Sequence, residues 1–113
     1  MDRDLAKRLF DFAIRVIKYC RTLRKSTENS IIINQLIKAD TSSGANYEEC
    51  QSASSRADFR NKMCICLKEM RESNFWLRII QNIQDVTPEL NYLINESNEL
   101  KKILATITKK VSD

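Results

Sequence analysis

Residues 59–80 read FRNKMCICLKEMRESNFWLRII and place large apolar side chains on two opposite sides of a predicted helix. One of these sides follows the alternating spacing of three and four residues that is typical of helices packed in bundles. The positions that form this inner side are Phe59, Met63, Cys66, Met70, Ser73, Leu77 and Ile80. The pattern predicts a long helix over residues 56–84, with Ser55 as its N-cap.

Three other segments show the same alternation and predict helices over residues 3–25, 28–53 and 88–111. Ser26 or Thr27 can cap the second of these, and Thr87 can cap the last, with Pro88 in its first turn. The inner positions of the three segments are Leu5, Leu9, Phe12, Val16, Tyr19 and Leu23; Ile33, Leu36, Asp40, Ser43, Tyr47 and Cys50; and Leu90, Leu93, Ser97, Leu100, Leu104, Ile107 and Val111.

The composition favours a few long helices joined by short connections. The chain has 113 residues, 42% apolar and 30% charged, with one glycine and one proline. This length suits one domain, and short connections make consecutive helices antiparallel. The sequence therefore predicts an all-α protein, a single domain over residues 1–113 with an up-down-up-down antiparallel four-helix bundle.

No apolar run approaches the length of a membrane span, and the N-terminus lacks the apolar segment of a signal peptide. We therefore expect a cytoplasmic protein with no membrane partner. The four cysteines form no C-x-x-C pair, and the chain has no histidine. Free thiols in a reducing compartment are expected, rather than a zinc site, and no cofactor is expected.

The second apolar side of residues 56–84 has the composition of a subunit contact, in which aromatic and branched residues dominate. A lone subunit would expose this side, and monomers rarely tolerate such patches. The alternative is that Trp76 lies across a neighbouring helix of the same subunit. The candidate subunit interface consists of Ile65, Glu69, Glu72, Trp76, Ile79 and Ile83, with Phe10, Ile14 and Ile17 of the first helix.

Positive charge gathers on the first helix, because residues 1–27 carry eight Lys and Arg against three acids. Such a stripe is either a solvated face or a surface for the phosphates of RNA or DNA. No aromatic residues alternate with these cations, so any binding would tolerate different sequences. The candidate nucleic-acid-binding residues are Lys7, Arg8, Arg15, Lys18, Arg21 and Lys25.

Polar residues in the middle of the chain favour a structural role over catalysis. Di-iron bundles need histidines beside their glutamates, and this chain has none, so we expect no metal site and no enzyme. Asn46, Tyr47 and Glu49 are expected to form a structural polar network between helices or subunits. Gly44 predicts a close approach by a neighbouring side chain such as Trp76.

Residues 35–80 resemble the 23S rRNA intervening-sequence, or S23, family in three motifs: GANYEE at 44–49, SRADF at 55–59 and LKEMRESNFWL at 67–77. This family is similar to the accessory variability determinant of diversity-generating retroelements. The resemblance implies a homopentamer and suggests nucleic acid and a reverse transcriptase as partners. Departures from the family pattern include Asp40, which stands where a small neutral residue is usual.

Together these features predict a non-enzymatic, homopentameric helical scaffold or accessory protein that binds RNA or DNA non-specifically through the basic face of the first helix. The alternative is an adaptor that docks one specific protein, such as a reverse transcriptase.

Overall fold

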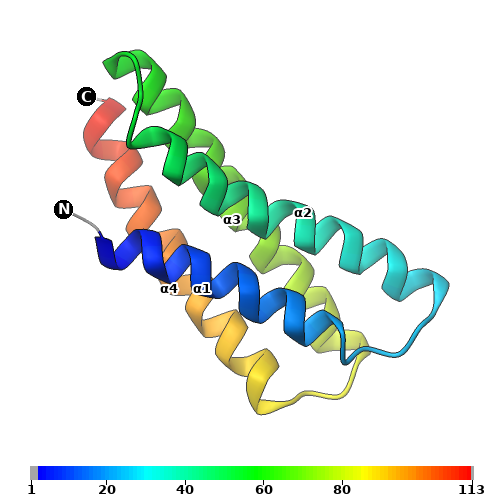
Figure 1. Cartoon of the computed structure of the whole chain (residues 1–113). Coiled ribbons are helices and arrows are strands. Elements are labelled where there is room, and N and C mark those ends of the chain that lie inside the picture. Colours follow the sequence, from blue (N-terminus) through cyan, green and yellow to red (C-terminus); the bar gives the residue numbers. More distant parts are fainter. Residues whose placement is uncertain (1–2, 113) are drawn as a thin grey trace.

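The computed structural model describes residues 3–112, which form four helices and no strand. The helices are α1 (Arg3–Cys20), α2 (Thr27–Cys50), α3 (Arg56–Ile83) and α4 (Pro88–Ser112). Consecutive helices run in opposite directions, and each contacts two neighbours, so that α1 also packs against α4 (Figure 1). The predicted all-α, up-down-up-down four-helix arrangement is confirmed. None of the described helices combines the length and apolar character needed to cross a membrane.

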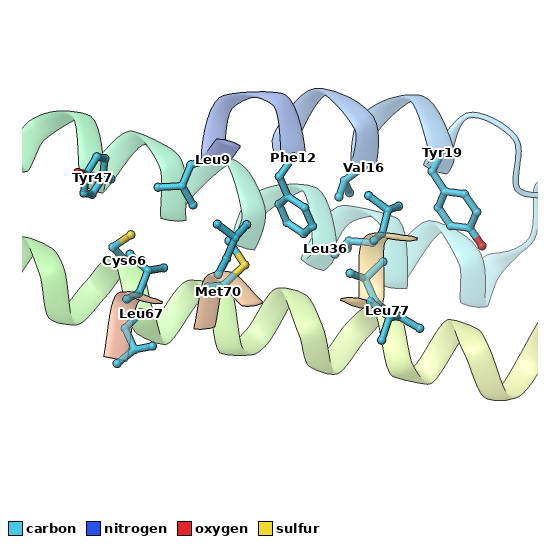
Figure 2. Close-up of a cluster of buried hydrophobic side chains, with 14 of the residues drawn as sticks. Leu9, Phe12, Val16, Tyr19, Leu36, Tyr47, Cys66, Leu67, Met70 and Leu77 are labelled. Carbon is cyan, nitrogen blue, oxygen red and sulfur yellow. The ribbon is translucent and has the colours of Figure 1, made fainter. Parts of the chain in front are cut away.

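The core consists mostly of the inner positions that the spacing predicts. On α2, however, Ile32 is buried and the predicted Ile33 is half-buried, and Leu23, Phe59, Ile107 and Val111 are also only half-buried. In Figure 2, Leu9, Phe12 and Val16 of α1 point toward Met70 and Leu77 of α3, along the axis between the helices. All five side chains are at most 2% exposed. Their burial removes apolar surface from water, and this is the main source of the bundle's stability.

Three helices begin at N-cap residues that the sequence predicts. The side chain of Ser26, in extended backbone, accepts a hydrogen bond from the amide of Asn29, and Ser55 accepts one from the amide of Asp58. At the start of α4, the Thr87 hydroxyl accepts a 3.1 Å hydrogen bond from the Leu90 amide. Each cap satisfies an amide that has no partner within its own helix.

Two helices end three or more residues earlier than their sequence predicts, and α3 ends one residue earlier, at Ile83. The first stops at Cys20 instead of residue 25, and the second stops at Cys50 instead of residue 53. After Cys20 the chain forms a turn, in which the Thr22 amide and hydroxyl both donate hydrogen bonds to the Tyr19 carbonyl, at 2.9 and 2.6 Å. The Asn29 side chain then donates to the Arg24 carbonyl at 2.7 Å and fixes the connection into α2. Lys25 therefore lies in a loop and not on α1.

Gly44 faces α1, and its expected proximity to Trp76 is wrong. A Cβ atom added at Gly44 would lie 3.7 Å from the Leu9 carbonyl oxygen and 3.8 Å from the Leu9 Cβ. These are ordinary van der Waals separations, so the backbone of α1 passes close to α2 here without requiring glycine.

Asp40 is the one charged residue among the buried side chains of residues 3–112. It is 1% exposed, and neither of its carboxyl oxygens has a hydrogen-bond partner. Burial raises the pKa of Asp40 to about 8, against a small opposing effect of the Thr41 amide. Asp40 in turn adds to the effect of burial on Cys20, whose pKa is raised to about 12. The core therefore favours the protonated, neutral form of this acid.

Candidate functional site

The second apolar side of α3 is less exposed than the sequence predicts. Ile65 and Ile83 are 39% and 49% exposed, whereas Trp76 and Ile79 are half-buried and pack against the core. The Trp76 indole also donates a 3.1 Å hydrogen bond from Nε1 to Glu72 Oε2. Trp76 is thus largely accommodated within its own subunit, and the exposed large apolar residues of α3 are Ile65, Phe75 and Ile83.

A second apolar surface lies between α1 and α2. Phe10 is 63% exposed, the largest exposed fraction among the large apolar residues of the described chain. It forms the rim of an open groove of about 540 Å³. Ile14 and Ile17 line the groove from α1, and Gly44 and Ala45 form its floor on α2. The groove exists because small residues of α2 face α1 and leave space between the two helices.

Half of the predicted basic stripe is already neutralised by acidic residues. Arg8 makes a bidentate ion pair with Glu96 (3.0 and 2.7 Å) and a further bond to Glu99 at 3.0 Å. The hydrogen bond to Glu96 makes the largest contribution to this pairing, which raises the pKa of Arg8 well above its ordinary value. Arg15 is bound by Glu89 in the same bidentate way, at 3.0 and 2.6 Å.

The remaining candidates of the stripe divide into two groups. Lys7 pairs with Asp11 one turn along α1, at 2.7 Å. Lys18, Arg21 and Lys25 are exposed, and none has an ion-pair partner among residues 3–112. Free positive charge of the stripe is therefore confined to the C-terminal end of α1 and the following loop.

The predicted polar network is local. Asn46 donates to the Ser42 carbonyl at 2.9 Å, within α2, and Tyr47 is buried in the core. Glu49 does bridge two helices, through an ion pair with Lys62 of α3 at 2.8 Å. Within the described residues, no three His, Cys, Asp or Glu side chains gather in an arrangement that could hold a metal ion.

The sequence reasoning missed a polar cluster between α3 and α4. The buried amide of Asn74 contacts Ser97 and Asn98 on one side and Arg78 and Lys101 on the other. Segment charges concealed it, because residues 85–113 carry four cations against five acids and look nearly neutral. The signal was the helical spacing, which places Lys101 on the side of α4 that faces away from Glu96 and Glu99.

The comparison with known proteins decides the family. The model of the family described as "23S rRNA-intervening sequence protein" matches residues 1–106. The chain belongs to this 23S rRNA-intervening sequence family. Its fold is similar to the crystal structure of a protein of unknown function from the S23 ribosomal protein family of Bacteroides thetaiotaomicron VPI-5482. The two share 32% identity with a TM-score of 0.83, over 93% of this chain and 98% of the other.

No protein with curated annotation matches the chain. The family model and this neighbour thus establish the family and the fold, and the function of the neighbour is itself described as unknown.

Proposed function

We propose that this protein is a non-enzymatic scaffold or accessory protein that assembles with copies of itself, as a homopentamer. The observation that supports assembly is the presence of two different apolar surfaces on one subunit. Phe10 projects beside the α1–α2 groove, and Ile65 and Ile83 are exposed on α3. Unlike surfaces that fit each other produce head-to-tail contacts, and such contacts form a ring when the rotation between subunits closes. The number of five subunits comes from the family resemblance alone.

RNA or DNA binding through helix α1 forms the second part of the proposal. Lys18, Arg21 and Lys25 carry it, since Lys7, Arg8 and Arg15 are held in ion pairs. A ring would repeat this charged end in every subunit, and phosphate binding strengthens with each cation that releases a counterion.

An adaptor role, in which the protein docks a specific partner such as a reverse transcriptase, is the alternative. The groove beside Phe10 favours it, because an apolar channel between two helices suits an amphipathic helix of another protein. A partner that binds there would compete with assembly. Added partner should therefore reduce the particle size if the protein is an adaptor, and should not reduce it if the protein is a self-assembling scaffold.

Light scattering tests the assembly. The wild-type protein should form a particle several times the 13.2 kDa of one chain. Phe10→Glu and Ile83→Glu should each reduce it to a monomer that remains helical, because both side chains are exposed and a buried unpaired charge is costly.

Ile31→Glu is the matched control for these variants. Ile31 is 57% exposed on α2, outside both proposed contact surfaces, so this variant should keep the size of the wild-type particle. A monomeric wild type, or dissociation by Ile31→Glu as readily as by Phe10→Glu, would contradict the proposal.

A further inference from the structure

A fully buried amide organises two cations where α3 meets α4. Asn74 is 0% exposed. Its Nδ2 donates to Ser97 Oγ at 2.8 Å and to Asn98 Oδ1 at 3.2 Å. Its Oδ1 accepts from Arg78 Nε at 2.9 Å and from Lys101 Nζ at 3.1 Å. Because every polar atom of the amide is used, the positions of both cations are fixed by the core and not by solvent.

These cations belong to a larger group that forms no ion pair with an acid of residues 3–112. Arg71 lies one turn before Asn74, and Lys102 follows Lys101 on α4. Burial lowers the pKa of Lys101, and the charges of Arg78, Arg71 and Lys102 lower it further. No carboxylate is among the groups that act on it, and none of the four cations has an ion pair within residues 3–112. Arg8 and Arg15 differ from these four cations, because acidic residues of α4 form ion pairs with both of them.

An exposed aromatic ring borders the group. Phe75 is 45% exposed, and the guanidinium carbon of Arg78 lies 5.9 Å from its ring centroid. Phe75, Arg78 and Asn82 line an open hollow of about 230 Å³, together with Ile79 and Ile83. An apolar ring, a cation and an amide are thus available within one hollow.

We infer that this α3–α4 surface binds single-stranded nucleic acid, with a phosphodiester held by Arg71, Arg78 and Lys101 and the adjoining base stacked on Phe75. Guanidinium groups bind phosphate oxygens through paired hydrogen bonds, and the terminal nitrogens of Arg78 have no partner among the described residues. Stacking needs an unpaired base, so a single strand fits the hollow and a duplex does not.

The site lies within one subunit and is separate from the cations of α1. It extends the nucleic-acid part of the proposed function to a second surface, and it requires no assembly. Ile79 and Ile83 line the hollow and also belong to the candidate subunit interface, so assembly through Ile83 would cover that part of the hollow.

The test uses a labelled oligouridine of roughly 12 nucleotides, a length within the range of single-strand sites, and follows its fluorescence anisotropy over a salt series. Trp76 supplies a second readout, because it is the only tryptophan and its ring centroid lies 5.1 Å from that of Phe75. A base that stacks on Phe75 should change the Trp76 emission.

The double variant Arg71→Gln, Lys101→Gln should weaken binding at least tenfold. It should also reduce the slope of log affinity against log salt by up to about 0.7, since the site neutralises one phosphate of a single strand. Phe75→Leu should weaken binding roughly tenfold and remove the change in Trp76 emission. The matched control is Lys38→Gln, Lys110→Gln, which removes the same charge from exposed positions elsewhere and should change affinity less than twofold.

Four outcomes would overturn the inference: no binding by the wild type at low salt, equal loss in the control variant, equally tight binding of an abasic strand, or equal displacement by a glutamate-rich peptide. Loss on Lys18→Gln, Arg21→Gln with none on Arg71→Gln, Lys101→Gln would place binding on α1 instead. Light scattering of the same samples reports assembly separately, so failure of this site and failure of the scaffold proposal are distinguishable.

Discussion

The guanidinium carbon of Arg15 lies 3.7 Å from the centroid of the Tyr92 ring, and the same side chain is bound by Glu89. A cation over an aromatic face and a bidentate carboxylate pair both hold α1 against α4. About two turns earlier, Arg8 makes the same kind of connection to Glu96. Two arginines that look like a ligand surface in the sequence therefore act inside the subunit.

Arg8→Gln should destabilise the fold and leave nucleic-acid binding nearly unchanged. Glu96 is only 12% exposed, so it would lose its partner in a partly buried position. We expect a loss of about 1 kcal/mol in the free energy of unfolding, measured by urea denaturation. Lys18→Gln, which breaks no ion pair, should leave stability unchanged. Weaker binding without any loss of stability in Arg8→Gln would contradict this role.

The buried Asp40 should make the protein less stable as pH rises. Its pKa is about 8 in the folded state and near 3.9 in an unfolded chain. Because the folded pKa is the higher one, the stabilisation is complete below the unfolded value and is lost as pH rises toward 8. Between about pH 5.5 and 8, unfolding should become easier by on the order of 3 kcal/mol.

Asp40→Ala should remove most of this pH dependence and raise the unfolding temperature at pH 8. Asp85→Asn serves as the control, because Asp85 is exposed and its loss should leave the slope as it is. A wild-type melting temperature that stays constant from pH 5.5 to 8 would show that the Asp40 carboxyl is solvated or paired.

Gly44→Ala should stabilise the protein. The added Cβ would meet Leu9 at ordinary contact distance, and alanine is favoured over glycine within a helix by about 0.5–1 kcal/mol. The reverse change at the next position, Ala45→Gly, should cost a similar amount and gives a matched comparison in thermal unfolding. A lower melting temperature for Gly44→Ala would mean that α1 and α2 approach more closely than the structure has them.

Alkylation should distinguish Cys64 from the other cysteines. Cys20, Cys50 and Cys66 are buried, and burial raises the pKa values of their thiols to about 12, 11 and 11. Cys64 is exposed. Because the thiolate is the reactive form, iodoacetamide at neutral pH should modify Cys64 first, as peptide mass spectrometry would report. Modification of Cys66 at the same rate as Cys64 in the native protein would count against the buried assignment.

The inner face of each helix could be predicted because it depends on spacing alone. Leu9 and Met70 are far apart in sequence, yet each repeats with its neighbours at three and four residues, which is sufficient to place both in the core. The N-caps at Ser26 and Ser55 could also be predicted, because each depends only on residues that are close in the sequence. The end of α1 was not, because no glycine or proline marks it and the chain turns through side-chain bonds of Thr22 and Asn29.

Partners between helices were beyond what spacing could predict. Arg8 and Glu96 are 88 positions apart, so the sequence showed a cation and an anion without showing that they meet. The same holds for Asn74 and Lys101, whose contact depends on the register between α3 and α4. Asp40 was visible as an unusual residue at an inner position, but only the packing shows that it has no hydrogen-bond partner.

The seam between α1 and α4 depends on charge, through Arg8 and Glu96 and through Arg15 and Glu89, and ions in solution weaken such contacts. Molar sodium chloride should therefore speed amide hydrogen exchange along α1 more than in the middle of α3, whose inner residues are held by apolar packing. Higher ionic strength should thus make the first helix detach more readily from the other three.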